Sequence, residues 1–299
     1  MNVSPKDNYF KTIIIQTTYQ CQMRCSNCYL GSMLNDKNIP DIDYDRLSEV
    51  LDLLPFRCDI RFIGAEPTMA PHLMDLIKLV RDKGHRPSML TNGLKLSKES
   101  YVKELKIAGL NTLGLSMNGG LDNNVYLLYD NGRYAKQKIK ALDNCFKNEI
   151  IPHINIIVTP FNLHVLKPLL SYIVESAIKY NIKFSRSKFP VMLRPKSIGQ
   201  MGNYLDTKSY TLDELIEIVS VLTETSVADI NKNNLVDTFE ETHTKVFSFN
   251  TLAGIMLCKV TDWNIDENGV IDAGSQRRGI LTDEYKIAPA FEYYKEKVT

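Results

Sequence analysis

The chain has 299 residues, which is long enough for one large α/β domain or two small ones with a sizeable buried core. Lysine plus arginine number 36 and aspartate plus glutamate 35, a balance that gives no reason to expect a nucleic-acid or membrane-surface partner. The start, MNVSPKDNYF, lacks the apolar core of a signal peptide, and no apolar run approaches the ~20 residues of a membrane-spanning helix. We therefore expect a soluble, cytoplasmic protein, whose six cysteines are more often ligands or catalysts than disulfides.

Apolar runs of β type alternate along the chain with amphipathic segments of helical period. The predicted strands are residues 12–17, 59–63, 88–91, 112–117, 154–159 and 182–185, and the predicted helices are residues 44–54, 71–83, 98–108, 134–147 and 165–180. Such alternation indicates a parallel sheet with right-handed crossovers. Six strands are too few for a closed eight-stranded barrel, so we predict an α/β fold with a partial (β/α)6 TIM-like barrel. Functional residues are then expected at the carboxyl ends of the strands.

Three cysteines follow the first predicted strand, in the stretch TTYQCQMRCSNCYLGSM. Cys21, Cys25 and Cys28 form a C-x3-C-x2-C array, which chance would place in such a chain with a probability of roughly a few in a thousand. A structural zinc site needs four ligands, and the nearest further candidates, Cys58 and His72, do not have ligand spacing. Three thiolates suit a [4Fe–4S] cluster in which one iron stays open for another ligand. The array therefore predicts such a cluster.

Three further segments follow the next three predicted strands. They read RFIGAEPTMAPHL, SMLTNG and GLSMNGG, in that order. Together with the cysteine array, they make the chain resemble the radical S-adenosylmethionine (SAM) superfamily over roughly residues 10 to 190. The family's partial (β/α)6 barrel agrees with the strand count reached from the apolar pattern.

The resemblance implies two cofactors and a mechanism. SAM would chelate the open iron through its amino and carboxylate groups. Reduction by an electron donor such as flavodoxin or ferredoxin would then release a 5′-deoxyadenosyl radical, which abstracts hydrogen from the substrate. The cofactors carry the difficult chemistry, and the protein positions and shields them.

The resemblance also assigns roles to residues, position by position. Those expected to bind the cofactor are Gly64, Ala65, Glu66 and Pro67 at the methionine amino group, Asn92, Ser116 and Asn118 near the carboxylate or ribose, and Ile157 and Val158 beside adenine. The position before the third cysteine is usually aromatic in the family but is Asn27 here, and we expect Tyr29 to take its place. Each feature alone also fits an ordinary turn, as the pair Asn92 and Gly93 illustrates. The ordered set, each member ending a strand at one edge, favours function.

Beyond residue 190 the resemblance fades, so we predict a core of residues 1–190 and a C-terminal extension of residues 191–299 that completes the barrel and shapes the substrate site. Cys258 is the only cysteine after Cys145, which excludes a second cluster ligated entirely by cysteines of the C-terminal third. The extension contains a β-hairpin signal around Asn268 and Gly269. Alternation places Met256, Cys258 and Val260 on one strand face, which we expect to turn inward.

Two tracts give opposite indications of the substrate's charge. The tract FSRSKFPVMLRPK holds four cations, Arg186, Lys188, Arg194 and Lys196, and suggests either a solvated basic loop or an anionic substrate. The loop after the fourth strand holds Asp122, Tyr126, Tyr129 and Asp130, which suggest either contacts with hydroxyl or amino groups or a plain surface loop.

Two classes of function fit the sequence. The first is a radical SAM enzyme acting on a small molecule, with epimerisation favoured and Cys258 as the catalytic hydrogen donor; a peptide-modifying enzyme, a dehydratase or a methylthio-type transferase is the alternative. A weak resemblance to aminoglycoside-type epimerases rests mainly on Cys258, and a packed core cysteine is its other interpretation. The second class is a non-enzymatic iron–sulfur redox or sensor protein, against which Glu66, Asn92 and Ser116 argue.

Overall fold

The computed structural model describes residues 2–199, 202–203, 205–235, 243–263, 278–290 and 293. Within them the strands form one mostly parallel sheet in the order β10-β9-β1-β2-β3-β4-β5-β6-β8-β7. The strands are β1 Thr12–Gln16, β2 Asp59–Ile63, β3 Arg86–Thr91, β4 Thr112–Ser116, β5 Ile151–Ile157, β6 Met192–Lys196, β7 Thr244–Thr251, β8 Gly254–Thr261, β9 Arg278–Leu281 and β10 Ile287–Pro289. The α-helices are α1 Tyr44–Leu53, α2 Leu73–Asp82, α3 Glu99–Ala108, α4 Asn123–Asp130, α5 Ala135–Lys147, α6 Leu163–Lys179, α7 Leu212–Thr223 and α8 Val227–Lys232.

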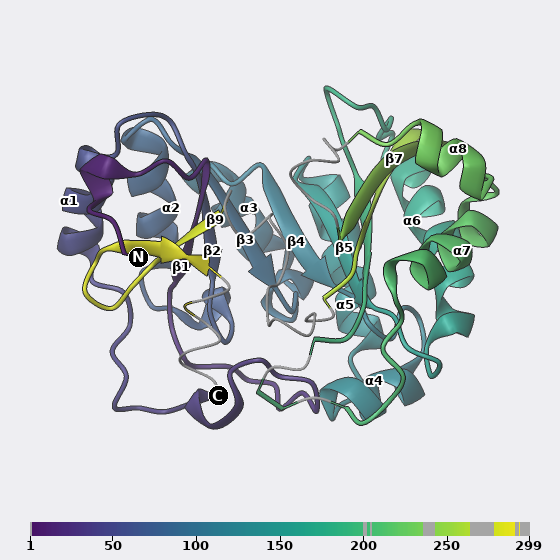
Figure 1. Ribbon diagram of the computed structural model, residues 1–299, viewed down its shortest axis with the longest axis horizontal. Coiled ribbons are helices and arrows are strands. Elements are labelled where there is room, and N and C mark those ends of the chain that lie inside the picture. Colours follow the sequence, from purple (N-terminus) through teal and green to yellow (C-terminus); the bar gives the residue numbers. More distant parts are fainter. Residues whose placement is uncertain are drawn as a thin grey trace.

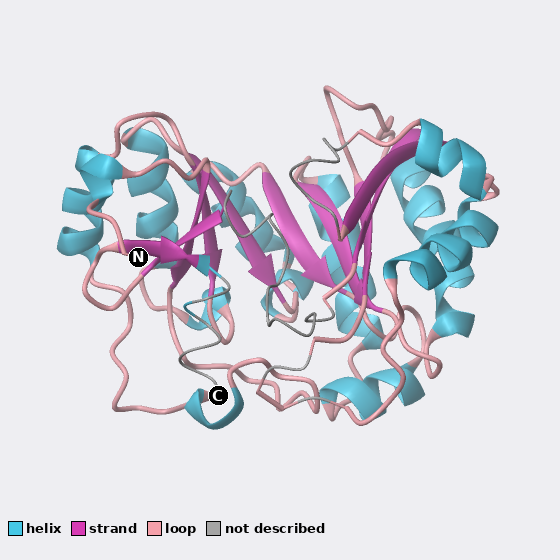
Figure 2. Cartoon of the chain, in the orientation of Figure 1, coloured by secondary structure: helices cyan, strands magenta, loops and turns pink. Residues whose placement is uncertain are grey.

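The helices lie along the outside of a curved sheet, as Figure 1 and Figure 2 show. Strands β1 to β6 run parallel, each to the next, so the predicted α/β partial barrel is confirmed. The main hydrophobic core lies between the outer face of the sheet and these helices. The inner face is left for the functional site.

Side-chain alternation decides which residues reach that inner face. In β2, Ile60 and Phe62 are fully buried in the core with the helices, whereas Arg61 and Ile63 line a cavity on the other side. In β1, Ile13 and Ile15 join the same core, and Ile14 lines the cavity. Successive strand residues point to opposite faces, so the residues of β1 and β2 that face away from the helices are the ones available to line the cavity.

The sixth parallel strand is Met192–Lys196, not residues 182–185 as the sequence suggested. The amide of Ile182 bonds to the carbonyl of Ala177 and closes the end of α6, and Phe184 forms only an isolated bridge to Gly254. The boundary predicted at residue 190 therefore falls just before the sixth strand of the sheet.

The C-terminal part contributes strands to both ends of this sheet. Strand β8 pairs parallel with β6 and antiparallel with β7, while β9 pairs parallel with β1 and antiparallel with β10. The C-terminal extension thus contains two antiparallel hairpins, which turn between Thr251 and Gly254 and between Leu281 and Ile287. Neither is the hairpin predicted around Asn268 and Gly269, since β8 lies between β6 and β7. The turn signal at Asn268 and Gly269 lies outside the described residues.

The loop predicted after the fourth strand contains a helix, α4, which begins after Asp122. The Asp122 carboxylate accepts a hydrogen bond from the Asn124 amide at 2.7 Å and caps the helix. In the part of the chain that the structure describes, no helix is both long and apolar enough to cross a membrane.

Candidate functional site

The cysteine loop is tied to the segment that follows β2 by backbone hydrogen bonds. The Thr17 amide donates to Ile63 O at 2.8 Å, the Ala65 amide to Thr18 O at 2.9 Å and the Glu66 amide to Gln20 O at 3.1 Å. These bonds extend the pairing of β1 and β2 past the ends of both strands. Residues 64–66 therefore lie alongside residues 17–20, directly before Cys21.

Glycine at position 64 is required by this close approach. A Cβ atom there would lie 2.6 Å from Thr18 O and 3.2 Å from the Thr18 amide nitrogen. Only a residue without a side chain lets the two backbones pass at this distance.

Gly64→Ala should therefore lower the free energy of unfolding by about 1–3 kcal/mol, because the backbone must shift to admit the methyl group. Urea unfolding measures the change. Gly199→Ala is the matched control, since a Cβ atom at Gly199 would meet only Trp263 Cβ, at 3.8 Å, without strain. Equal losses in the two variants would contradict a close-packed Gly64.

The three cysteines of the array are half-buried and lie on one loop. Burial raises the pKa of the Cys21 thiol to about 11, and it raises the pKa values of Cys25 and Cys28 as well. Buried thiolates are unfavourable without a neighbouring cation, which iron would supply. Cys58, Cys145 and Cys258 are fully buried in the core. The donor set thus fits a cluster held by three thiolates with one iron open.

Two hydrogen-bond donors lie beside the Cys21 thiol. Among the described residues, no three His, Cys, Asp or Glu side chains are gathered as one metal ion would require. In a [4Fe–4S] cube each cysteine binds through its own iron atom. The Met23 amide lies 3.3 Å from Cys21 Sγ, and Asn92 Nδ2 lies 3.7 Å from it. Such donors stabilise a thiolate ligand.

Glu66 connects the loops at this edge of the sheet. The residue is 1% exposed. Oε1 accepts from the Thr68 amide at 3.1 Å and from the hydroxyls of Thr68 and Thr91, each at 2.7 Å, and Oε2 accepts from the Asn92 amide at 2.7 Å. Because a carboxylate offers about four acceptor sites, Oε2 has room for one further donor. Asn92, predicted near the ligand, is thus held by Glu66 beside Cys21.

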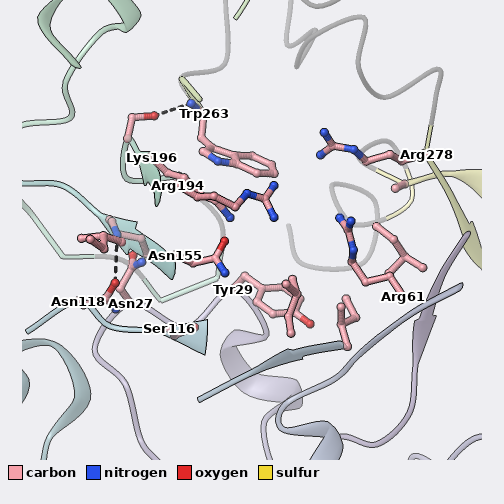
Figure 3. Close-up of a pocket in the computed structure, with 18 residues that line it drawn as sticks. Asn27, Tyr29, Arg61, Ser116, Asn118, Asn155, Arg194, Lys196, Trp263 and Arg278 are labelled. Carbon is pink, nitrogen blue, oxygen red and sulfur yellow. Dashed lines mark hydrogen bonds between the residues drawn. The ribbon is translucent and has the colours of Figure 1, made fainter. Parts of the chain in front are cut away.

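A cavity of about 290 Å³ opens on the inner face of the sheet (Figure 3). It gathers Asn27, Tyr29, Ser116, Asn118 and Ile157 of the residues discussed for SAM. The Tyr29 hydroxyl lies 3.2 Å from Gly64 O, and Asn118 Oδ1 accepts from the Ile157 amide at 3.0 Å. The cysteine loop and the ends of β4 and β5 therefore meet around one space.

Gly64, Ala65, Glu66, Pro67 and Asn92 are not among the residues that line the cavity, and Val158 and Cys258 lie in the core. Val158 is fully buried and packs in the core, so its side chain faces away from Ile157 and from the cavity. Cys258 is likewise fully buried in that core, on β8 opposite Leu193 and beside helix α7. Met256, Cys258 and Val260 do share one face, as alternation predicted, but this face packs toward the helices. The expected inward orientation of Cys258 is wrong.

Several residues that the sequence did not single out line the cavity. Asn155 is 9% exposed, and its Oδ1 is buried without a hydrogen-bond donor from the described residues. Trp263 and Arg61 also line the cavity. For Arg61 the sequence did offer a signal, since this residue stands between Ile60 and Phe62 in the apolar strand DIRFI. A charged residue between two core residues of a strand points to the face opposite the core.

Four cations line the same cavity: Arg61 from β2, Arg194 and Lys196 from β6, and Arg278 from β9. Figure 3 shows Arg194 reaching in from one side and Arg61 and Arg278 from the other. Burial, together with Arg278, lowers the pKa of Arg61 to about 10, and burial with the neighbouring arginines lowers that of Lys196. Burial and the nearby Arg194 and Arg61 lower the pKa of His153 to about 3, so this imidazole is neutral.

The two tracts that suggested substrate contacts have different positions. Arg186 and Lys188 lie outside the cavity, and Arg186 donates to Ser248 Oγ. Tyr126 and Tyr129 in α4 are fully buried. Asp130 is 3% exposed and pairs with a buried Lys138, the two charged atoms being 3.3 Å apart. Helix α4 also contacts the cysteine loop, since the carbonyl oxygen of Tyr129 accepts a hydrogen bond from the amide of Ser26 at 2.8 Å.

Comparison with curated proteins finds relatives that match about half of the chain. The chain is 32% identical over 138 residues to 7,8-dihydro-6-hydroxymethylpterin dimethyltransferase of Methanocaldococcus jannaschii, covering 44% of this chain and 27% of that protein. It is 28% identical over 179 residues to the tungsten-containing aldehyde ferredoxin oxidoreductase cofactor-modifying protein of Pyrococcus furiosus, covering 56% and 49%. The matched stretches thus span less than half of these relatives.

Solved structures share the fold at low sequence identity. SuiB of Streptococcus suis superposes with a TM-score of 0.65 at 14% identity, covering 97% of this chain and 62% of that one. The structure of anSMEcpe with bound AdoMet gives a TM-score of 0.50 at 18% identity, covering 71% and 59%.

The family model described as "Radical SAM superfamily" matches residues 15–172, which is more than half of the chain. This stretch contains the cysteine array, the Gly64–Pro67 segment and strands β2 to β5. The family uses a [4Fe–4S] cluster and SAM, in agreement with the three-thiol loop and the adjoining cavity. The chain belongs to the radical SAM superfamily.

Proposed function

We propose that this radical SAM enzyme binds its cluster through Cys21, Cys25 and Cys28 and abstracts hydrogen from a substrate held in the cavity between β1 and β6. The observation that carries the proposal is that the cysteine loop, whose first residues pair with the Gly64–Glu66 backbone, meets the strand ends of β4 and β5 around one space. When bound, the cofactors supply a 5′-deoxyadenosyl radical.

The chain's own residues would bind and orient SAM. Glu66 Oε2 has room for one more donor, which suits the methionine ammonium. Asn155 Oδ1 is a buried acceptor that suits a ribose hydroxyl or a substrate donor. Ser116 and Asn118 line the same wall, and Ile157 and Tyr29 offer apolar surface for adenine.

Formation of 5′-deoxyadenosine tests this function. The reconstituted protein, reduced anaerobically with SAM present, should release 5′-deoxyadenosine in amounts that increase with enzyme concentration. A reductant of low potential such as flavodoxin or ferredoxin is the electron donor that we propose for the cell. Absence of 5′-deoxyadenosine from protein with a full cluster would favour the redox or sensor alternative.

Glu66→Gln should weaken SAM binding by about 1.5–3 kcal/mol, because an acceptor in charge-assisted hydrogen bonds is replaced by an amide. The cluster should survive, since the cysteines are unchanged. Equilibrium binding of SAM and iron content measure the two effects separately. Unchanged SAM affinity would restrict Glu66 to holding Thr68, Thr91 and Asn92 in place.

The reaction after hydrogen abstraction is the finer part of the proposal. The matched relatives named above include a dimethyltransferase and a cofactor-modifying protein, and their names give no support to an epimerase. A thiol that returns hydrogen to a substrate radical must reach the cavity, and the Cys258 side chain lies in the core instead. We therefore propose a small-molecule substrate without assigning epimerisation to Cys258. A peptide substrate is the second candidate, because one structure of similar fold is that of SuiB bound to the precursor peptide SuiA.

A further inference from the structure

The cations of the cavity form a cluster that the cofactors alone do not explain. Arg61, Arg194, Lys196 and Arg278 all line one space, and none of the lining residues that the structure describes is an aspartate or glutamate. The guanidinium groups converge from strands at opposite sides of the sheet (Figure 3). We call these four residues the cationic cluster.

Gathering these charges opposes folding. Within the described ranges, neither the Arg61 guanidinium nor the Lys196 ammonium forms an ion pair, and Lys196 Nζ lies 5.7 Å from the centre of the Trp263 ring. Arg194 is 7% exposed. Burial disfavours the charged form of each group, and like charges add to this cost. Proteins keep such arrangements where a ligand offsets the cost on binding.

We propose that the cationic cluster binds a compact anionic group of the substrate, either a phosphate or a pair of carboxylates. This proposal rests on the proposed function in one respect, which is that the anionic group is taken to belong to the enzyme's substrate. Guanidinium groups offer paired donors that match both carboxylate and phosphate oxygens, and an ammonium adds a point charge. Trp263, at the edge of the cluster, gives an apolar wall for the part of the substrate that carries the anion.

The carboxylate of SAM does not account for the cluster. SAM carries one carboxylate, which neutralises one charge, whereas four cations line the cavity. The residues that we expect to bind SAM come from the cysteine loop, from the segments that follow β2 and β3, and from the ends of β4 and β5. Three of the four cations come instead from β6 and β9, strands that supply none of the residues expected to bind SAM.

The chain provides its own reporter for this site. Trp263 is the only tryptophan among the 299 residues, and it lines the cavity beside Lys196. Its amide donates to Ser197 Oγ, which fixes the backbone next to β6. A change in tryptophan fluorescence therefore reports an event at the cluster.

The test uses the reconstituted holoprotein with saturating SAM, titrated with inorganic phosphate, succinate or the neutral analogue succinamide. Calorimetry measures binding, and Trp263 fluorescence locates it. We expect saturable binding of phosphate or succinate but not of succinamide, and Lys196→Met should weaken it by about tenfold or more. Tighter binding of phosphate would identify a phosphate-bearing substrate, and tighter binding of succinate a dicarboxylate.

Arg186→Gln is the matched control, because Arg186 comes from the same basic tract but lies outside the cavity. Its anion binding should equal that of the unaltered protein. Lys196→Met should also raise the thermal midpoint, since it removes a buried charge that has no counter-ion among the residues that the structure describes. This result would separate lost binding from lost folding.

The inference is overturned if neither anion binds saturably, or if Lys196→Met and Arg186→Gln bind them as the unaltered protein does. Failure of the proposed function would look different. Anion binding at Trp263 without formation of 5′-deoxyadenosine would support the anion site and contradict the proposed enzymatic function. Formation of 5′-deoxyadenosine without anion binding would support the proposed enzymatic function and contradict only the anion-binding role of the cationic cluster.

Discussion

Replacing Cys21, Cys25 or Cys28 by alanine should remove the cluster and abolish formation of 5′-deoxyadenosine. The unaltered protein, reconstituted anaerobically, should bind about four irons per chain, since a cube held by three thiolates has no spare protein ligand. Each of the other three cysteines is fully buried in the core and cannot replace a missing ligand without unfolding. Iron analysis and the absorption of the cluster measure the loss.

Cys145→Ala provides the control, because Cys145 lies in the core and its pKa is raised by burial alone. That variant should keep its iron and its activity. About eight irons per chain would indicate a second cluster and contradict the three-thiol site. Retention of the cluster in Cys25→Ala would do so as well.

Lys138→Met should cost the protein about 3–5 kcal/mol of unfolding free energy, because it leaves the buried carboxylate of Asp130 without its partner. Lys138 is fully buried, with Nζ 3.3 Å from Asp130 Oδ2 and 2.9 Å from the Ser116 carbonyl that it donates to. One substitution therefore removes both an ion pair and a support for the end of β4. Urea unfolding measures the change.

Lys147→Met is its control, since Lys147 pairs with Glu99 at the surface at 2.7 Å and half of its side chain is exposed. Exposed pairs contribute ~0–1 kcal/mol. The double variant Lys138→Met with Asp130→Leu should recover much of the loss, because the uncompensated charge is gone. A loss no larger than that of Lys147→Met would mean that water reaches the pair.

Local sequence signals were enough for the first five strands and the cluster ligands. Strand β1 reads TIIIQ and β2 reads DIRFI, and in both the apolar residues that pack on the helices recur at every second position. The cysteine array needs no tertiary information, because its three members lie within eight residues of one loop. The candidate SAM residues Ser116 and Ile157 end β4 and β5, where a parallel sheet places its functional side chains.

The apolar pattern does not reveal the sixth strand, because charged residues and a proline interrupt it. Strand β6 reads MLRPK, in which Pro195 cannot donate a backbone hydrogen bond and Arg194 and Lys196 break the apolar pattern. These two cations face the cavity, so the residues that bring charge into the site also conceal the strand. A run with fewer charges, residues 182–185, was favoured in its place.

The orientation of Cys258 was wrong because alternation separates two faces without saying which one meets the cavity. In a partial barrel the apolar face of a strand packs against the outer helices, and the polar face turns to the lumen. Met256, Cys258 and Val260 therefore join the helices. Lys259, on the other face of β8, lies close enough to Lys196 to lower its pKa.

The pairing of β1 with β9 has a consequence for the making of the protein. Thr12 is paired with Arg278, so one edge of the first strand to be synthesised is completed by a strand from near the other end of the sequence. At ~5–20 residues per second a ribosome needs on the order of tens of seconds between the two. Throughout that time the nascent chain presents an uncovered strand edge, which favours pairing with other chains. The complete sheet can therefore form only after translation has passed β10, and slow synthesis or crowded polysomes would favour aggregation at β1.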